Sequence, residues 1–105
     1  MDYNEAFELS KTYKPPAIYI VSEVARKDIE SNRQLHDEMR SQLAYPLYLK
    51  VGERGWLMFK PQYDDRFHHV HTSTIASATP WGNGEDTVVI ETRNTIYTLI
   101  KEQTL

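Results

Sequence analysis

The chain has 105 residues, of which 40% are hydrophobic and 26% charged, and its formal net charge is −3. These values are ordinary for one globular domain and exclude wholesale disorder. Basic residues are spread over both halves of the chain rather than clustered, which disfavours a nucleic-acid-binding stripe. The absence of cysteine excludes disulfides, thiol catalysis and thiolate metal sites.

We expect a cytoplasmic protein that does not enter a membrane and holds no cofactor. A chain without cysteine fits a reducing compartment. Its first residues, Met1–Glu5, are acidic and polar, unlike the start of a signal peptide. No apolar run approaches the ~20 residues of a membrane-spanning helix.

The first 44 residues are predicted to form a helical arm. Asn4–Thr12 reads as a short helix, which Lys14-Pro15-Pro16 breaks. Ala17–Val21 is ambiguous, because its β-branched and aromatic residues suit a strand but it could equally open a long helix. From Glu23 to Ala44 the composition is rich in helix formers and free of Gly and Pro. This predicts a long, partly exposed helix that Pro46 ends.

Residues 45–105 read as short strands joined by turns. The predicted strands are Leu47–Val51, Trp56–Lys60, Phe67–Ala76, Thr87–Thr92 and Thr95–Lys101. A two-residue turn at Arg93-Asn94 would pair the last two strands with Ile90 facing Tyr97 and Val88 facing Leu99. Both faces of this hairpin are partly apolar, so we expect the long helix to cover the second face.

The expected fold is α+β, with an N-terminal helical arm packed on a small, twisted antiparallel sheet or SH3-like barrel of about five strands. The arm is residues 1–44 and the β domain is residues 45–105, and we expect the two to fold as one unit. The predicted core residues are apolar positions on the strands: Leu47, Leu49, Val51, Leu57, Phe59, Ile75, Val88, Ile90, Ile96, Tyr97 and Leu99.

One stretch, from the loop after Pro61 into the following strand, carries most of the chemically reactive side chains. Three of the four histidines lie within His68–His71. His69 and His71 would point to the same side of a strand, and with Asp64 or Asp65 nearby they could ligate zinc or nickel. The other interpretation is a polar loop running into a strand whose histidines form hydrogen bonds. No nucleophile motif or second acid–base element supports catalysis by this cluster.

The same loop also predicts a protein-contact surface. Aromatic side chains beside a few charges are typical of interface hot spots. Trp81 stands in a Pro-Trp-Gly turn, where we expect it to be exposed. The predicted partner-binding residues share an aromatic or charged side chain in a loop or turn: Tyr63, Asp64, Asp65, Arg66, Phe67 and Trp81.

Two segments of the second half, His71-Thr72-Ser73-Thr74-Ile75 and Thr87–Leu99, form a distinctive pattern within Gly52–Lys101. This pattern resembles that of small proteins carried by phages and mobile elements of Gram-positive bacteria. In those proteins a Thr-Ser strand precedes a strand and a Thr-x-Asn-x-x-Tyr-x-Leu hairpin. The resemblance implies a small accessory protein that acts inside the bacterial cell. Phage accessory proteins of this size are often inhibitors of host defence, including anti-CRISPR proteins.

The leading hypothesis is therefore a non-enzymatic accessory protein that binds a protein of the bacterial host and inhibits a host defence complex. One alternative is a nucleic-acid-binding regulator, which the acidic balance disfavours. Another is a metal-dependent enzyme that uses the His68–His71 cluster. A homodimer stays open, because a small core leaves apolar surface for a partner.

Overall fold

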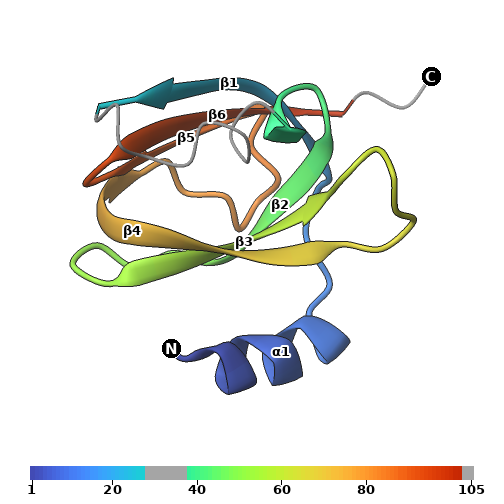
Figure 1. The fold of residues 1–105 in the computed structure, drawn as a ribbon. Coiled ribbons are helices and arrows are strands. Elements are labelled where there is room, and N and C mark those ends of the chain that lie inside the picture. Colours follow the sequence, from blue (N-terminus) through green and yellow to red (C-terminus); the bar gives the residue numbers. More distant parts are fainter. Residues whose placement is uncertain (28–37, 103–105) are drawn as a thin grey trace.

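The computed structural model describes residues 1–27 and 38–102, which form a closed antiparallel β-barrel with one helix packed outside it (Figure 1). The elements are α1 (Tyr3–Thr12), β1 (Tyr19–Arg26), β2 (Leu43–Tyr48), β3 (Arg54–Lys60), β4 (His68–Ala78), β5 (Thr87–Thr92) and β6 (Thr95–Lys101). Strands pair in chain order, and β1 closes the barrel against β6. In these two segments no helix has the length and apolar character needed to cross a membrane.

The predicted N-terminal helix is confirmed, and α1 begins one residue before the predicted Asn4. A capping box fixes its start. The Asp2 carboxylate accepts the Glu5 backbone N–H at 2.8 Å, and the Asp2 N–H donates to Glu5 Oε1 at 3.3 Å. The backbone becomes extended at Tyr13, before the two prolines. Figure 1 shows α1 beneath the wall formed by β3 and β4.

The ambiguous segment Ala17–Val21 runs into β1, so the helix predicted for Glu23–Ala44 is wrong at both ends. A register shift just after Val21 marks a β-bulge, and Val21 and Val24 are both buried as a result. Three-residue spacing of apolar side chains imitates the pattern of a helix. Pairing with β6 therefore decides the structure here against local helix propensity. Residues 28–37 of the predicted helix lie outside the described residues.

Pro46 does not end a helix, because it lies within β2. This strand starts and stops earlier than the predicted Leu47–Val51. It pairs with β1 only at Leu43 and Ala44, and its register with β3 shifts just after Pro46. A proline lacks a backbone N–H and is tolerated at such a bulge. The predicted arm of residues 1–44 thus supplies β1 and the start of β2 to the barrel.

The fold is mostly β, and the described part of the chain contains six strands rather than the predicted five or so. Register shifts interrupt the pairing of β1, β2, β3 and β4. Bulges increase the local bend and twist of a strand, which a short barrel needs in order to close.

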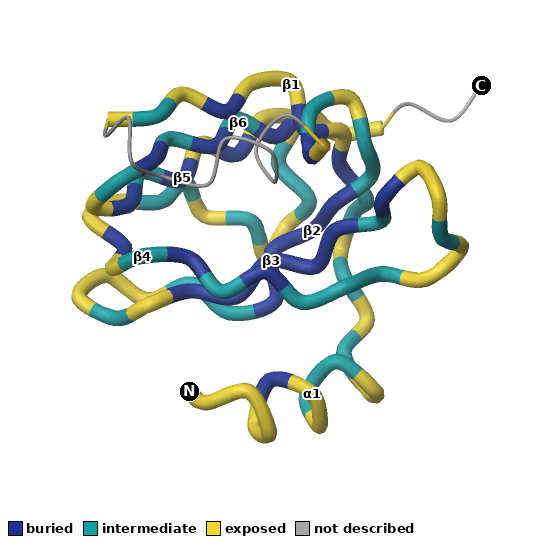
Figure 2. The backbone as a smooth tube through the Cα atoms, in the orientation of Figure 1, coloured by how far each residue is buried: buried dark blue, intermediate teal, exposed yellow. Residues whose placement is uncertain are grey.

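The core fills the barrel interior, and buried residues follow the inward sides of the strands (Figure 2). Most predicted core residues are buried: Leu47, Leu57, Phe59, Ile75, Val88, Ile90, Tyr97 and Leu99. Leu49 and Ile96 are half-buried. Val51 is wrong as a core residue, because it lies in the turn after β2 with 64% of its surface exposed. The predicted register of the last hairpin is confirmed, with Ile90 opposite Tyr97 and Val88 opposite Leu99.

The outer face of that hairpin is partly apolar, as predicted. The long helix that was predicted to cover it is wrong at both ends, its residues 28–37 lie outside the described residues, and α1 does not pack on this face. Ile20 and Ile100 are paired across β1 and β6, and both are exposed, as is Val89 on β5. The helix packs instead against Trp56 on β3 and His69 on β4. The first residues of the chain therefore shape the opposite wall of the barrel.

Gly55 in β3 is predicted to tolerate no side chain. A Cβ there would lie 2.9 Å from Ile75 Cδ1 and 3.1 Å from Thr72 Oγ1, whose hydroxyl accepts the Gly55 N–H. Gly55→Ala should lower the free energy of unfolding in urea by about 1–3 kcal/mol, because the packed interior has to shift. Gly82→Ala is the matched control, since nothing lies within 4 Å of its Cβ position. An equal effect of both substitutions would contradict the close packing at Gly55.

Candidate functional site

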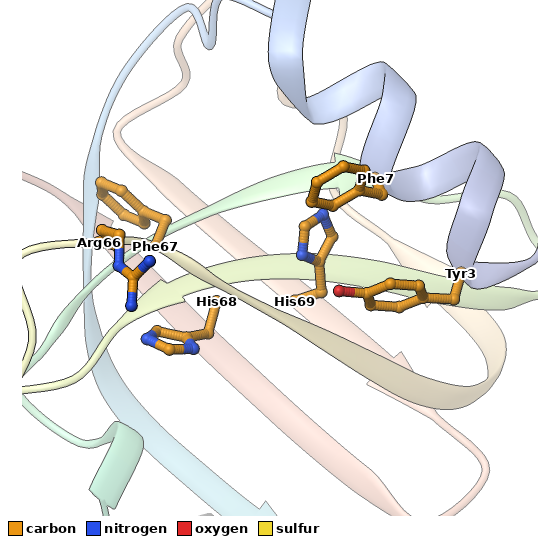
Figure 3. Close-up of a pocket in the computed structure, with 6 residues that line it drawn as sticks. All are labelled: Tyr3, Phe7, Arg66, Phe67, His68 and His69. Carbon is orange, nitrogen blue, oxygen red and sulfur yellow. The ribbon is translucent and has the colours of Figure 1, made fainter.

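A pocket of about 390 Å³ opens between α1 and the first residues of β4 (Figure 3). Its lining combines aromatic and basic side chains: Tyr3, Phe7, Arg66, Phe67, His68 and His69. Two of these come from α1, two from the end of the β3–β4 loop and two from β4. Pockets of this size suit one small ligand or a few side chains of a partner.

His69 forms the back of the pocket and holds α1 to the barrel. Its Nε2 lies 3.1 Å from Ser10 Oγ, and its ring centroid lies 5.3 Å from that of Tyr3 and 6.0 Å from that of Phe7. Burial lowers the pKa of His69 below its usual value, while hydrogen bonding to the Ala6 backbone acts in the opposite direction. The neutral imidazole is thus the form that the folded protein favours.

Trp56 makes the second link between α1 and the barrel. Its Nε1 donates to the backbone carbonyl of Met1 at 2.9 Å. The indole ring stacks on His71, with centroids 3.9 Å apart and an interplanar angle of 5°. Tyr3 meets the same indole edge-on at 6.0 Å. The segment before Asn4 is therefore tied to the outer face of β3 and β4.

The prediction that His69 and His71 share one side of a strand is confirmed. They pair with Met58 and Trp56 on β3, and both rings contact Trp56. Burial also lowers the pKa of His71, helped by the charges of Arg54 and the N-terminal amine. Among residues 1–27 and 38–102, no group of three or more His, Cys, Asp or Glu side chains could hold a metal ion. The two rings pack against aromatic neighbours.

Asp64 organises the loop that leads into β4. Its Oδ2 lies 2.7 Å from His68 Nε2, and its Oδ1 accepts the Arg66 backbone N–H at 3.0 Å. The guanidinium Nε of Arg66 approaches the same Oδ1 at 3.5 Å. The hydrogen bond from His68 is the main reason why the pKa of Asp64 falls to about 2. The Asp64 carboxylate, which was predicted to contact a partner, makes its hydrogen bonds to His68 and Arg66.

The other predicted contact residues divide into two groups. Tyr63, with 79% of its surface exposed, and Asp65 form the outer part of the loop. Phe67 is half-buried and lies 5.0 Å from the Tyr45 ring. Trp81 was expected to be exposed, but it is half-buried, with its Nε1 donating to the hydroxyl of Tyr13 at 3.2 Å.

Trp81 belongs to the same aromatic belt as Phe67 without lining the pocket. The Tyr13 ring stacks on Tyr45 at 6.1 Å, and Tyr45 in turn contacts Phe67. Four aromatic side chains therefore contact one another in a row along this side of the barrel: Trp81, Tyr13, Tyr45 and Phe67. Trp81 is half-buried because its indole packs beside Tyr13, the residue that follows α1, and donates a hydrogen bond to its hydroxyl.

Tyr3 and Phe7 are the site residues that sequence reasoning missed. Both are exposed, at 55% and 42%, and they stack on each other at 6.1 Å. Lys11, one turn further along, lies over the Phe7 ring at 4.7 Å. Positions 3, 7 and 11 follow the i, i+4 rule and so share one helix face. That spacing of exposed aromatic residues was the available signal.

Comparison with known proteins gave no match to any protein-family model, curated protein or solved structure. The resemblance to phage and mobile-element proteins therefore stays a prediction. What the pocket does has to be inferred from its own side chains.

The lowered histidine pKa values predict that acid weakens the fold. The unfolded chain takes up protons near the usual histidine pKa of 6.5, while His69 and His71 resist protonation in the folded state. The unfolded state then binds more protons, so the free energy of unfolding should fall as the pH drops through about 6.5. Urea unfolding at a series of pH values measures this slope.

His69→Gln is the matched variant, because glutamine can still hydrogen-bond to Ser10 but does not titrate. The slope between about pH 7.5 and pH 5.5 should be smaller in the variant than in the wild type. Asp64 does not interfere, since its stabilising contribution is lost only as the pH falls from its usual 3.8 toward about 2. An unchanged slope would contradict the burial of His69 beneath α1.

Proposed function

We propose that this chain is a non-enzymatic protein-binding module and that the pocket between α1 and β4 is its contact surface. The observation that carries the proposal is the exposure of Tyr3 and Phe7 on one side of a pocket whose other side carries Arg66 (Figure 3). Tyrosine and arginine are enriched among the residues that dominate binding energy at protein interfaces. Large rings that remain exposed in the free protein gain burial when a partner docks.

The surface is also rigid enough for this role. The capping box fixes the first turn of α1, and Trp56 and His69 hold the helix against the barrel. Side chains that are ordered before binding lose less conformational entropy when the complex forms. Aromatic rings have few rotatable bonds, so Tyr3 and Phe7 offer contact area at low entropic cost.

The resemblance of the second half supplies the biological context of the proposal. The partner is then a protein of a Gram-positive bacterial host, and binding inhibits a host defence complex, as anti-CRISPR proteins do. A non-catalytic role is supported by the engagement of the reactive side chains. His68 is bonded to Asp64, His69 to Ser10, and His71 is stacked on Trp56. The net charge of −3 favours a protein partner over a nucleic acid.

Affinity capture with paired variants tests the proposal. The tagged chain is incubated with nuclease-treated lysate of a Gram-positive host, and retained proteins are identified by mass spectrometry. We expect one protein in stoichiometric amount. Phe7→Ala should reduce its retention by about tenfold or more, because the variant removes an exposed ring from the pocket.

Val51→Ala is the control variant, because it also deletes an exposed apolar side chain but lies in the turn at the other end of β3. It should retain the partner as the wild type does. Circular dichroism of both variants checks that α1 and the barrel are intact. Retention of no protein, or equal loss with both variants, would count against the proposal.

A further inference from the structure

The pocket is locally basic on an acidic protein. None of the six lining residues carries a carboxylate, whereas Arg66 carries a positive charge and His68 and His69 carry imidazoles, of which His69 favours its neutral form. The whole chain has 15 acidic and 12 basic side chains, so this lining departs from the average surface. The one carboxylate that contacts the lining, that of Asp64, is paired with His68 and Arg66, so its charge is already compensated when a negative group of a partner approaches.

The nearest carboxylate, that of Asp64, is already occupied. It accepts hydrogen bonds from the Arg66 backbone and His68, and Arg66 Nε lies 3.5 Å from its Oδ1. The Arg66 side chain is 83% exposed, and its two terminal nitrogens have no hydrogen-bond partner in the parts of the chain that the structure describes. These nitrogens form the edge of the guanidinium that binds carboxylates in bidentate fashion.

The walls on either side of this basic group are apolar rings. Figure 3 shows Phe7 over His69 on the α1 side, and Phe67 beside Arg66 on the loop side. The hydroxyl of Tyr3 points toward His69 in the same view. The pocket thus places apolar rings next to the guanidinium of Arg66 (Figure 3), so a complementary ligand joins an apolar group to an anionic one.

We propose that the pocket binds a short peptide segment of the partner in which an aspartate or glutamate adjoins a large aromatic or aliphatic residue. The carboxylate pairs with the free edge of Arg66, and the apolar side chain packs between Phe7 and Phe67. The inference rests on the proposed protein-binding function and names the chemistry of the partner's contact segment.

An acidic peptide fits this site better than a nucleic acid. A nucleic acid carries charge along its whole length and needs a continuous basic path. Beyond the pocket it would meet Asp65 on the loop and Glu8 on α1, both exposed. A single carboxylate beside an apolar side chain needs only the local basic lining.

Selection from a display library of random twelve-residue peptides on the immobilised full-length chain tests the inference. Enriched peptides should carry Asp or Glu next to Phe, Tyr, Trp or Leu. Arg66→Gln should weaken their binding by about twofold to fivefold, which is the upper part of the range for an exposed charge pair. Changing the peptide's acidic residue to its amide should weaken binding to the wild type by a similar factor.

A thermodynamic cycle makes the test specific. The same amide change should have little effect on binding to Arg66→Gln, because the pair is already broken. Val51→Ala should bind the peptides as the wild type does. Enriched peptides without an acidic residue, additive effects of the two changes, or no enrichment at all would overturn the inference.

Two further results would separate this inference from the proposed function. Arg66-dependent binding of a single-stranded oligonucleotide at low salt, with no acidic peptide enriched, would assign the pocket to nucleic acid and overturn the inference. If a host protein is retained in a Phe7-dependent way but its binding does not change with Arg66→Gln, the protein-binding function stands and the acidic-peptide chemistry is wrong.

Discussion

Closure of the barrel by β1 against β6 is the constraint on which the rest of the structure depends. The pairing runs from Tyr19 with Lys101 to Arg26 with Thr95, which joins residues far apart in the chain. It places Tyr19, Val21 and Val24 in the interior. The bulges that permit closure also decide which side chains turn inward, because each shifts the alternation of its strand.

Docking of α1 covers the outer face of β3 and β4 and forms the pocket at the edge of this contact. β3 is buried on both sides, with Leu57 facing the interior and Trp56 beneath the start of the helix. His69 and His71 on β4 contact Trp56 and belong to the same packed contact. These histidine side chains pack between α1 and the barrel, and the rings of Tyr3 and Phe7 remain exposed at the edge of this contact. The packed contact between α1 and the barrel and the pocket beside it are thus parts of one arrangement.

The loop before β4 carries Arg66, the positively charged residue of the pocket, and contacts within the loop hold it in place. Asp64 binds His68, four residues later, and the Arg66 backbone, two residues later, so the loop is ordered by its own side chains. This leaves the edge of the Arg66 guanidinium facing outward from a fixed base. In the proposed site, affinity for an anionic group would depend on Arg66, whereas Asp64 makes the hydrogen bonds that hold the loop. A substitution of Asp64 removes hydrogen bonds that order the loop, whereas a substitution of Arg66 removes the exposed positive charge, although both residues belong to one ion pair.

The amino-acid sequence by itself determined the features that rest on local physics. These are α1 with its cap and proline stop, the last hairpin with its register, the shared side of His69 and His71, and the polar loop from Gln62. Only the tertiary structure decided the rest. Residues of good helix propensity became part of β1 because pairing with β6 and burial of Val24 outweigh a weak local preference. The pocket likewise joins α1 to β4, about 60 positions away, through contacts such as Ser10 with His69 that no local pattern encodes.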